Sequence, residues 1–470
     1  MQNYGERTKK EVLLIAFVMV FGAFAPLLDA TMVNIALNPM MSDFKVTLST
    51  IQWVTTGYTL MMGIAVPFAG WATDRFEGRH VWIVGLGAFL VGSVVSVLSH
   101  DFTILLVGRL IQGASAGLLM TSLTTIIVRA AGGNLGKLMA VVGLPVLLGP
   151  ILGPILGAVL VQHYDWHMIF WVNVPITIIG AVLAAVFLPK LDSIAPKKQF
   201  DWLGILLLAV MFAGFIYGIS KVDVQSGFAT SIVLVPLTIA VVALVLYVIY
   251  AQKGAHPIVK LDLFRSKNFS ASMILLVLAG VATNGPMMLL PLFFQNVQQD
   301  TLIGAALGMV PQALGMLVTR SQAGKLTDKI GPRLIVLIGL FVTLVGTIPL
   351  VTINNHTSTL LIVLVLFVRG MGLGLYQVPV MASPYLGFSR ERAGEISVAT
   401  RLLQNIGGAF GSAILGIVVA NAISAHTIDN VIDNLSHAYN MGFWVAVGLN
   451  IFAFIPAIFL AGKPRHNEMN

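Results

Sequence analysis

The chain has 470 residues, of which 57% are hydrophobic and only 10% are charged, and it contains no cysteine. This composition excludes a soluble protein of this length, and the lack of thiols excludes disulfides and thiolate chemistry. The net charge of +8 does not indicate a nucleic-acid-binding protein, because the excess cations are spread over many short stretches instead of one basic domain.

Long apolar segments recur along the whole chain. Each has roughly 18–25 residues, which is enough to cross about 30 Å of hydrocarbon as an α-helix. We therefore predict an all-α polytopic membrane protein with fourteen transmembrane helices. The predicted spans are residues 12–38, 51–72, 81–98, 103–128, 137–161, 168–188, 203–219, 230–250, 271–297, 303–323, 334–352, 358–385, 399–423 and 440–461.

The cations predict the orientation. Most of the 27 Lys and Arg lie at the two ends of the chain or in the even-numbered turns between spans, and only Lys45 and Lys221 lie in odd-numbered turns. By the positive-inside rule, both termini then lie in the cytoplasm.

Two short patterns occur twice. The turn Gly70-Trp-Ala-Thr-Asp74-Arg75-Phe-Glu-Gly78-Arg79 returns as Gly324-Lys-Leu-Thr-Asp328-Lys329-Ile-Gly331-Pro-Arg333. The segment Gly108-Arg109-Leu-Ile-Gln112-Gly113 is echoed by Val368-Arg369-Gly370-Met-Gly372. Two echoes in register indicate a duplicated membrane unit, which is typical of transporters. We predict an N-terminal six-helix bundle, a linker with two additional transmembrane helices, and a C-terminal six-helix bundle, at residues 1–188, 189–269 and 270–470.

Asp29 is the one acid that lies well inside a predicted span. A carboxylate in hydrocarbon is costly, so Asp29 is expected to bind a proton or a cation, or else to be the structural partner of a nearby Arg or backbone donor. Arg109 is the natural counter-charge for Asp29, and Gln112 lies on the same helical face as Arg109. The alternative is that Arg109 is a structural residue that bonds only backbone carbonyls. Arg320 and Arg369 lie near span ends, where an arginine side chain can extend to the membrane surface, so they rank below Arg109 as functional candidates.

The fifth predicted span carries a stack of small residues. Gly149, Gly153 and Gly157 recur at every fourth position, which gives a smooth face for close approach of another helix. Pro150 and Pro154 weaken the same helix by removing backbone donors. We interpret this span as a packed, deformable seam, and ordinary helix packing is the alternative.

Asp74 and Asp328 each lie where a predicted cytoplasmic turn begins, with cations alongside. Such exposed pairs are weak, which suits a contact that forms and breaks during a conformational change. We interpret them as a conformational latch, formed by Asp74, Arg75 and Arg79 in the first copy and by Asp328 and Arg333 in the second.

Polar side chains on apolar spans are candidates to line a substrate cavity, and neighbouring methionines would supply an adaptable wall. Each of them singly is more often a helix–helix hydrogen bond. The candidates are Asn34, Gln112, Asn284, Met287, Met288, Gln295, Tyr376, Gln377, Gln404 and Asn405. No sequence motif for a metal site or a catalytic nucleophile is present, so neither a cofactor nor an enzymatic activity is expected.

Taken together, these motifs resemble the major facilitator superfamily, and in particular its fourteen-span drug:proton antiporters, over essentially the whole chain. Further matching segments are Leu28-Asp29-Ala-Thr-Met-Val-Asn34-Ile-Ala-Leu37, Trp166-His-Met-Ile-Phe-Trp-Val-Asn173-Val-Pro175 and Phe200-Asp-Trp-Leu-Gly204. The resemblance implies two six-helix bundles plus two inserted helices, alternating access, and export of hydrophobic, often cationic compounds driven by the proton gradient. It also implies Asp29 as the proton or cation site, Arg109 as its tuner and Asp74 as a latch.

The leading hypothesis is a monomeric proton-coupled antiporter that exports amphipathic, often cationic drugs across the plasma membrane of a bacterium, with protons and membrane lipids as its other partners. One alternative is an exporter of an endogenous lipid, peptide or organic anion, because a single deep acid facing Arg109 makes a pocket for multivalent cations less secure. Another alternative is a transporter-like receptor or scaffold. It would require a sizeable soluble domain, and the polar stretches of this sequence are too short to form one.

Overall fold

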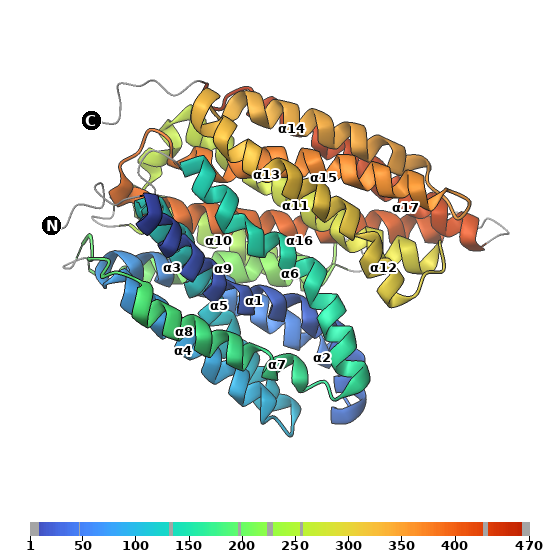
Figure 1. The fold of residues 1–470 in the computed structure, drawn as a ribbon, viewed down its shortest axis with the longest axis horizontal. Helices are drawn as coiled ribbons and strands as arrows, with labels where there is room; N and C mark the ends of the chain where they lie inside the picture. The colour runs from blue at the N-terminus through green and yellow to red at the C-terminus, as the bar shows by residue number, and fades with distance from the viewer. Residues whose placement is uncertain are drawn as a thin grey trace.

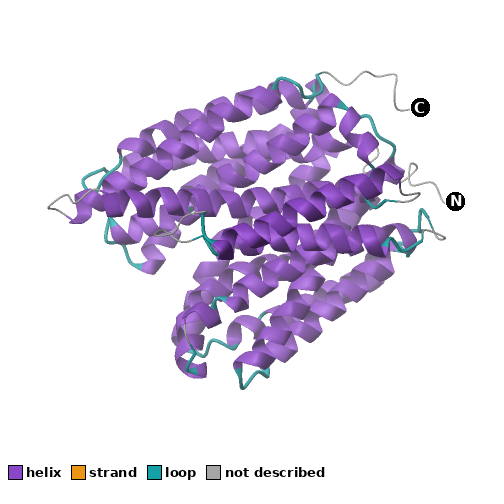
Figure 2. Ribbon diagram, turned by 180° about the vertical axis from the view of Figure 1, so that it is seen from behind, coloured by secondary structure: helices purple, strands orange, loops and turns teal. Residues whose placement is uncertain are grey.

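The computed structural model describes residues 9–46, 48–130, 135–195, 199–222, 229–253, 257–425 and 431–462. Every regular element in these ranges is a helix (Figure 2). Twelve of the described helices are long and apolar enough to cross a membrane. Helices α3 and α6 coincide with the other two predicted spans but are not among those twelve. The all-helical membrane architecture is thus confirmed, and the count of fourteen stays a prediction.

The first half of the chain forms a bundle in which α1 packs against α6 and α8, and α5 packs against α3 and α4. The helix α1 is long because its interior is almost entirely apolar, and Pro26 and Pro39 lie within it. The helices are α1 Lys9–Phe44, α2 Leu48–Ile51, α3 Trp53–Arg75, α4 Gly78–Val97, α5 Phe102–Ala130, α6 Leu135–His163, α7 Met168–Trp171 and α8 Asn173–Phe187.

Two further helices follow. The first, α9, lies along the boundary between the halves, since it packs against both α3 and α16, and the second, α10, packs against α9. Asp201 caps α9 by accepting a 2.9 Å hydrogen bond from the amide of Gly204, and it also accepts one of 2.5 Å from the hydroxyl of Tyr250 on α10. Its carboxylate therefore ties the pair together. The two helices are α9 Trp202–Ser220 and α10 Ser231–Lys253.

The second half repeats the packing of the first. Helices α11 and α16 pair as α1 and α6 do, and α15 packs against α13 and α14 as α5 does against α3 and α4. This is the arrangement expected of a duplicated unit. The elements are η1 Leu261–Arg265, α11 Lys267–Asn296, α12 Leu302–Gly308, α13 Val310–Ile330, α14 Pro332–Thr347, η2 Ile348–Thr352, α15 Thr359–Ala382, η3 Ser383–Tyr385, η4 Arg390–Arg392, α16 Ala393–Ala425 and α17 Val431–Ala457.

The two halves meet at the end where α1 begins and α17 ends, and they diverge toward the end that carries α2, α7 and α12 (Figure 1). At the closed end, Gly70 on α3 lies so close to Val398 on α16 that an added Cβ would approach its side chain to 2.4 Å. Arg401 on α16 also donates a 3.0 Å hydrogen bond to the hydroxyl of Thr124 on α5. Direct contacts thus hold the halves together at this end.

Candidate transport site

Asp29 is fully buried within α1 and joins three helices. Its Oδ2 accepts a 2.5 Å hydrogen bond from Nη1 of Arg109 on α5, and its Oδ1 accepts one of 2.7 Å from Nδ2 of Asn173 on α8. The carboxylate therefore faces the interior of the bundle instead of lipid. Sequence reasoning assigned no role to Asn173, although the residue lies in a segment that resembles the family.

Arg109 is also fully buried, and it binds more than the carboxylate. Its Nη1 donates to Oε1 of Gln112 at 2.7 Å, and its Nε donates to the carbonyl of Val54 on α3 at 3.1 Å. The guanidinium carbon lies 4.3 Å from the centre of the Tyr58 ring. Both predicted partners, the acid and the backbone carbonyl, are thus present. Gln112 is buried in this network and does not line the cavity described next.

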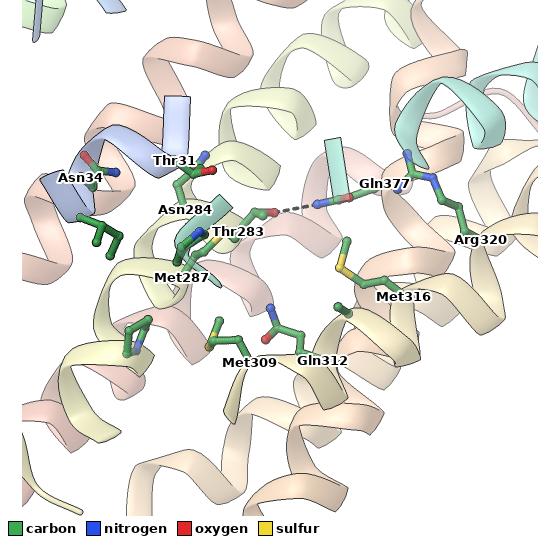
Figure 3. Close-up of a pocket in the computed structure, with 14 residues that line it drawn as sticks. Thr31, Asn34, Thr283, Asn284, Met287, Met309, Gln312, Met316, Arg320 and Gln377 are labelled. Carbon is green, nitrogen blue, oxygen red and sulfur yellow. Dashed lines mark hydrogen bonds between the residues drawn. The ribbon is translucent and has the colours of Figure 1, made fainter. Parts of the chain in front are cut away.

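A cavity of about 320 Å³ lies between the two halves, within the size range of small-molecule sites (Figure 3). Helices α1, α6, α11, α13 and α15 contribute its wall. Of the predicted cavity residues, Asn34, Asn284, Met287 and Gln377 line it. The other lining residues are Thr31, Ile35, Pro154, Thr283, Pro291, Met309, Gln312, Ala313, Met316 and Arg320.

The remaining candidates lie elsewhere. Met288 is 41% exposed on the outer side of α11, because successive residues of a helix point in different directions. Gln295 donates a 3.3 Å hydrogen bond to the carbonyl of Pro291, one turn earlier on the same helix. Tyr376 is buried in the core, and Gln404 and Asn405 are half-buried on α16 outside the lining set.

Arg320 does not extend toward the membrane surface, which corrects the prediction. It lies in the middle of α13, is only 3% exposed, and lines the cavity. Its Nε donates a 2.9 Å hydrogen bond to the carbonyl of Ala140 on α6, across the boundary between the halves. The predicted span ends at residue 323, close to Arg320, whereas α13 continues to Ile330 and so places Arg320 at its centre.

Arg369 corrects the same prediction. It is buried in α15, where its Nη2 donates to the carbonyl of Ala282 on α11 at 2.9 Å and its Nη1 donates to Oε1 of Gln312. In the first half, the equivalent cation binds a carboxylate on α1. In the second half, a backbone carbonyl of α11 takes that place.

The glycine stack of α6 faces α1, the helix that carries Asp29. An added Cβ at Gly153 would lie 1.9 Å from Oγ1 of Thr31, and one at Gly157 would lie 3.2 Å from the carbonyl oxygen of Met32. The hydroxyl of Thr31 donates a 3.0 Å hydrogen bond to the carbonyl of Gly149. Of the two prolines, Pro154 lines the cavity, and the side chain of Pro150 lies outside the described residues. The close seam is therefore made with the helix that bears the buried acid.

Asp74 is buried at the closed end, and its ion-pair partner is Arg129 at the end of α5. Arg129 also donates a 2.8 Å hydrogen bond to the carbonyl of Thr73. The predicted partner Arg79 instead donates to the carbonyl of Leu188 at 3.2 Å, and Arg75 shows no ion pair with a described residue. The pair is thus buried instead of exposed, and Arg129 was missed because it follows a long apolar run.

In the second copy, Asp328 lies near the end of α13 and Arg333 lies in the first turn of α14. The amide of Arg333 donates a 3.3 Å hydrogen bond to the carbonyl of Ala461, which follows α17. The role of these two residues as a latch stays a prediction.

Removing the cation of the buried pair is expected to open the closed end. In Arg129→Gln, Asp74 loses the guanidinium of Arg129. Asp74 lies beside α16, where an added Cβ at Gly394 would be 2.6 Å from its Oδ1. Because the chain has no native cysteine, Val398→Cys between α3 and α16 gives a unique thiol whose modification rate reports opening. We expect that rate to rise about tenfold, the equivalent of about 1.4 kcal/mol.

The matched control is Arg75→Gln, which removes the cation next to Asp74 in the sequence, at the end of α3, where Arg75 forms no ion pair with a described residue. It should leave the modification rate of the Val398→Cys thiol unchanged. Equal rates in Arg129→Gln and in the parent protein would show that the buried pair does not hold this end closed.

Comparison with known proteins decides the family. The family model described as Major Facilitator Superfamily matches residues 19–412. The chain belongs to the major facilitator superfamily. The proton:xylose symporter XylE shares the fold, with a TM-score of 0.66 and 14% identity over 96% of this chain and 95% of that one.

Named relatives agree with a transporter instead of an enzyme, and with a multi-pass membrane protein. The "Multidrug resistance protein B homolog" of Mycobacterium tuberculosis is 28% identical over 98% of this chain and 92% of its own length. The "Lincomycin resistance protein LmrB" of Listeria monocytogenes is 27% identical over 87% and 86%. The "Riboflavin transporter RibZ" of Clostridioides difficile is 26% identical over 97% and 98%. The names of relatives with similar sequence identity thus refer to different compounds.

Proposed function

We propose that the protein is a proton-coupled antiporter that exports amphipathic organic compounds, including drugs, across the bacterial plasma membrane by alternating access. The observation that carries the proposal is Asp29, a fully buried acid bound by Arg109 and Asn173. Intramembrane acids in such networks typically serve ion or proton pathways. The names of the multidrug and lincomycin resistance relatives support an organic cargo.

The acid and the cavity share one helix. Thr31 and Asn34 line the cavity, and they lie on α1 within five residues of Asp29. A proton bound at Asp29 removes the negative charge that holds Arg109 of α5, so α1 is no longer tied electrostatically to α5. Through the glycine seam, any shift of α1 is felt by α6, which also contributes to the cavity wall.

The proposed cycle follows from these contacts. If both termini are cytoplasmic, the closed end of the structure faces the cytoplasm and the diverging end faces outward (Figure 1). From this form cargo leaves the cavity, and Asp29, which is fully buried here, takes up a proton from outside as its pair with Arg109 breaks. The halves then close outside and open inside, the proton passes to the more alkaline cytoplasm, and the restored carboxylate re-forms its pair with Arg109 as new cargo binds.

The test uses the full chain in liposomes with an imposed pH gradient and a fluorescent organic probe, such as ethidium or an anionic dye. The proposal predicts accumulation of at least one probe against its own gradient, and a protonophore should abolish that accumulation. Transport that stays downhill, or that is insensitive to the protonophore, would contradict proton coupling.

A further inference from the structure

The cavity carries one kind of charge. Of the fourteen described residues that line it, Arg320 is the only charged one, and the rest supply amides, hydroxyls, thioethers and apolar groups (Figure 3). Asp29 is not among them, and both of its oxygens already accept hydrogen bonds inside the first bundle. No lining residue therefore offers a negative charge to a cationic cargo.

Arg320 is a cation with unused binding capacity. Among the described residues, its Nε alone forms a hydrogen bond, to the carbonyl of Ala140, and no carboxylate forms an ion pair with it. At 3% exposure, an unpaired guanidinium is costly to keep in a membrane interior. The terminal nitrogens form a planar fork that matches a carboxylate or a phosphate.

The surroundings add to the positive character. Behind the wall, Arg369 donates to Oε1 of Gln312, so the amide NH₂ of Gln312 is left to act as a donor. Gln377 is engaged differently, because its Nε2 donates a 2.8 Å hydrogen bond to the hydroxyl of Thr283 (Figure 3). Two buried cations thus stand at or behind one side of the cavity.

We propose that the cavity takes an amphipathic organic anion whose oxyanion binds the terminal nitrogens of Arg320. Its apolar part lies against Met287, Met309 and Met316, whose flexible thioethers adapt to different shapes. This assignment rests on the proposed transport function and specifies the charge of its cargo. The anion and the carbonyl of Ala140 use different nitrogens of Arg320, so binding does not require the contact between the halves to break.

The test compares three probes that share one naphthalene ring system and differ in charge: 2-naphthoate, its methyl ester and 2-naphthylmethylammonium. Their affinities are measured for the full chain in lipid nanodiscs by scintillation proximity with radiolabelled compounds. We expect the carboxylate to bind about tenfold more tightly than either of the others, as one buried charge-assisted contact allows. Arg320→Gln should remove this preference, and Arg320→Lys should restore part of it.

Arg401→Gln is the matched control. Arg401 is another buried arginine at the boundary between the halves, where its Nη2 donates to Thr124 and to the carbonyl of Met120, but it does not line the cavity. This variant should keep the preference for the carboxylate even where the contact between the halves is weakened.

The anion assignment is overturned if the ammonium compound binds most tightly, if none of the three compounds binds, or if Arg320→Gln and Arg401→Gln lower all affinities alike. Failure of the proposed function looks different. In that case the carboxylate binds in an Arg320-dependent manner, but no pH gradient drives its accumulation in liposomes.

Discussion

Replacing Asp29 by Asn is expected to lower proton-driven accumulation of cargo in liposomes about a hundredfold or more, while exchange of cargo for cargo persists. The amide keeps the size of the side chain and can still accept a hydrogen bond from Asn173, but it neither gains nor loses a proton. Because the proposed cycle couples proton transfer to transport through this one group, its loss removes the coupling step. The loss of transport is therefore expected to exceed that caused by removing an ordinary contact.

The substitution also leaves Arg109 buried without its counter-charge, which for buried pairs costs about 3–5 kcal/mol of stability. A fall in thermal stability is therefore expected and must be separated from loss of coupling. The double variant Asp29→Asn/Arg109→Gln removes both charges and should recover part of the stability without recovering uphill transport. Asp43→Asn changes an exposed acid on the same helix and should behave like the parent protein. Undiminished accumulation by Asp29→Asn would contradict the role of Asp29.

The second large effect is expected at Gly153. In Gly153→Ala, the new methyl group would lie 1.9 Å from Oγ1 and 2.9 Å from Cβ of Thr31, so α6 must move away from α1. Because both helices contribute to the cavity wall, we expect transport to fall about tenfold or more, with a loss of roughly 1–3 kcal/mol in stability from overpacking. Initial rates in liposomes and thermal unfolding measure the two effects.

Gly157→Ala is the matched control on the same helical face, because the nearest atom to its new methyl group is 3.2 Å away and small adjustments accommodate it. A partial rescue is expected in the double variant Gly153→Ala/Thr31→Ala, which removes the closest overlapping atom. If Gly153→Ala transports as well as Gly157→Ala does, the seam is ordinary packing without a role in the cycle.

Much of the fold was predictable from the sequence, because hydrocarbon allows few solutions to the backbone. Long apolar segments had to be helices, and the repeated turns at Asp74 and Asp328 indicated two related halves. The pairing of Asp29 with Arg109 was also predictable, since a single deep acid and a deep cation reduce their cost only by meeting. The glycine stack predicted a close helix contact but could not name its partner, which is α1.

The cavity was less predictable, for a geometric reason. Whether Met287 or its neighbour Met288 faces the cavity depends on the rotation of α11, and the amphipathic signal is weak when lipid and protein interior are both apolar. Arg320 was expected to reach the membrane surface because it stands near the end of a predicted span, and nothing in the sequence distinguishes Arg129 from the other cations that follow apolar runs. Both are instead buried against partners on other helices, which only the tertiary arrangement specifies.

The most direct measurement is the release of protons when cargo binds to the purified protein in weakly buffered solution near neutral pH, followed with a pH-sensitive dye. The account predicts that the parent protein releases protons when cargo binds and that Asp29→Asn releases none, provided that the variant still binds. Equal proton release by the two proteins, at matched cargo occupancy, would contradict it.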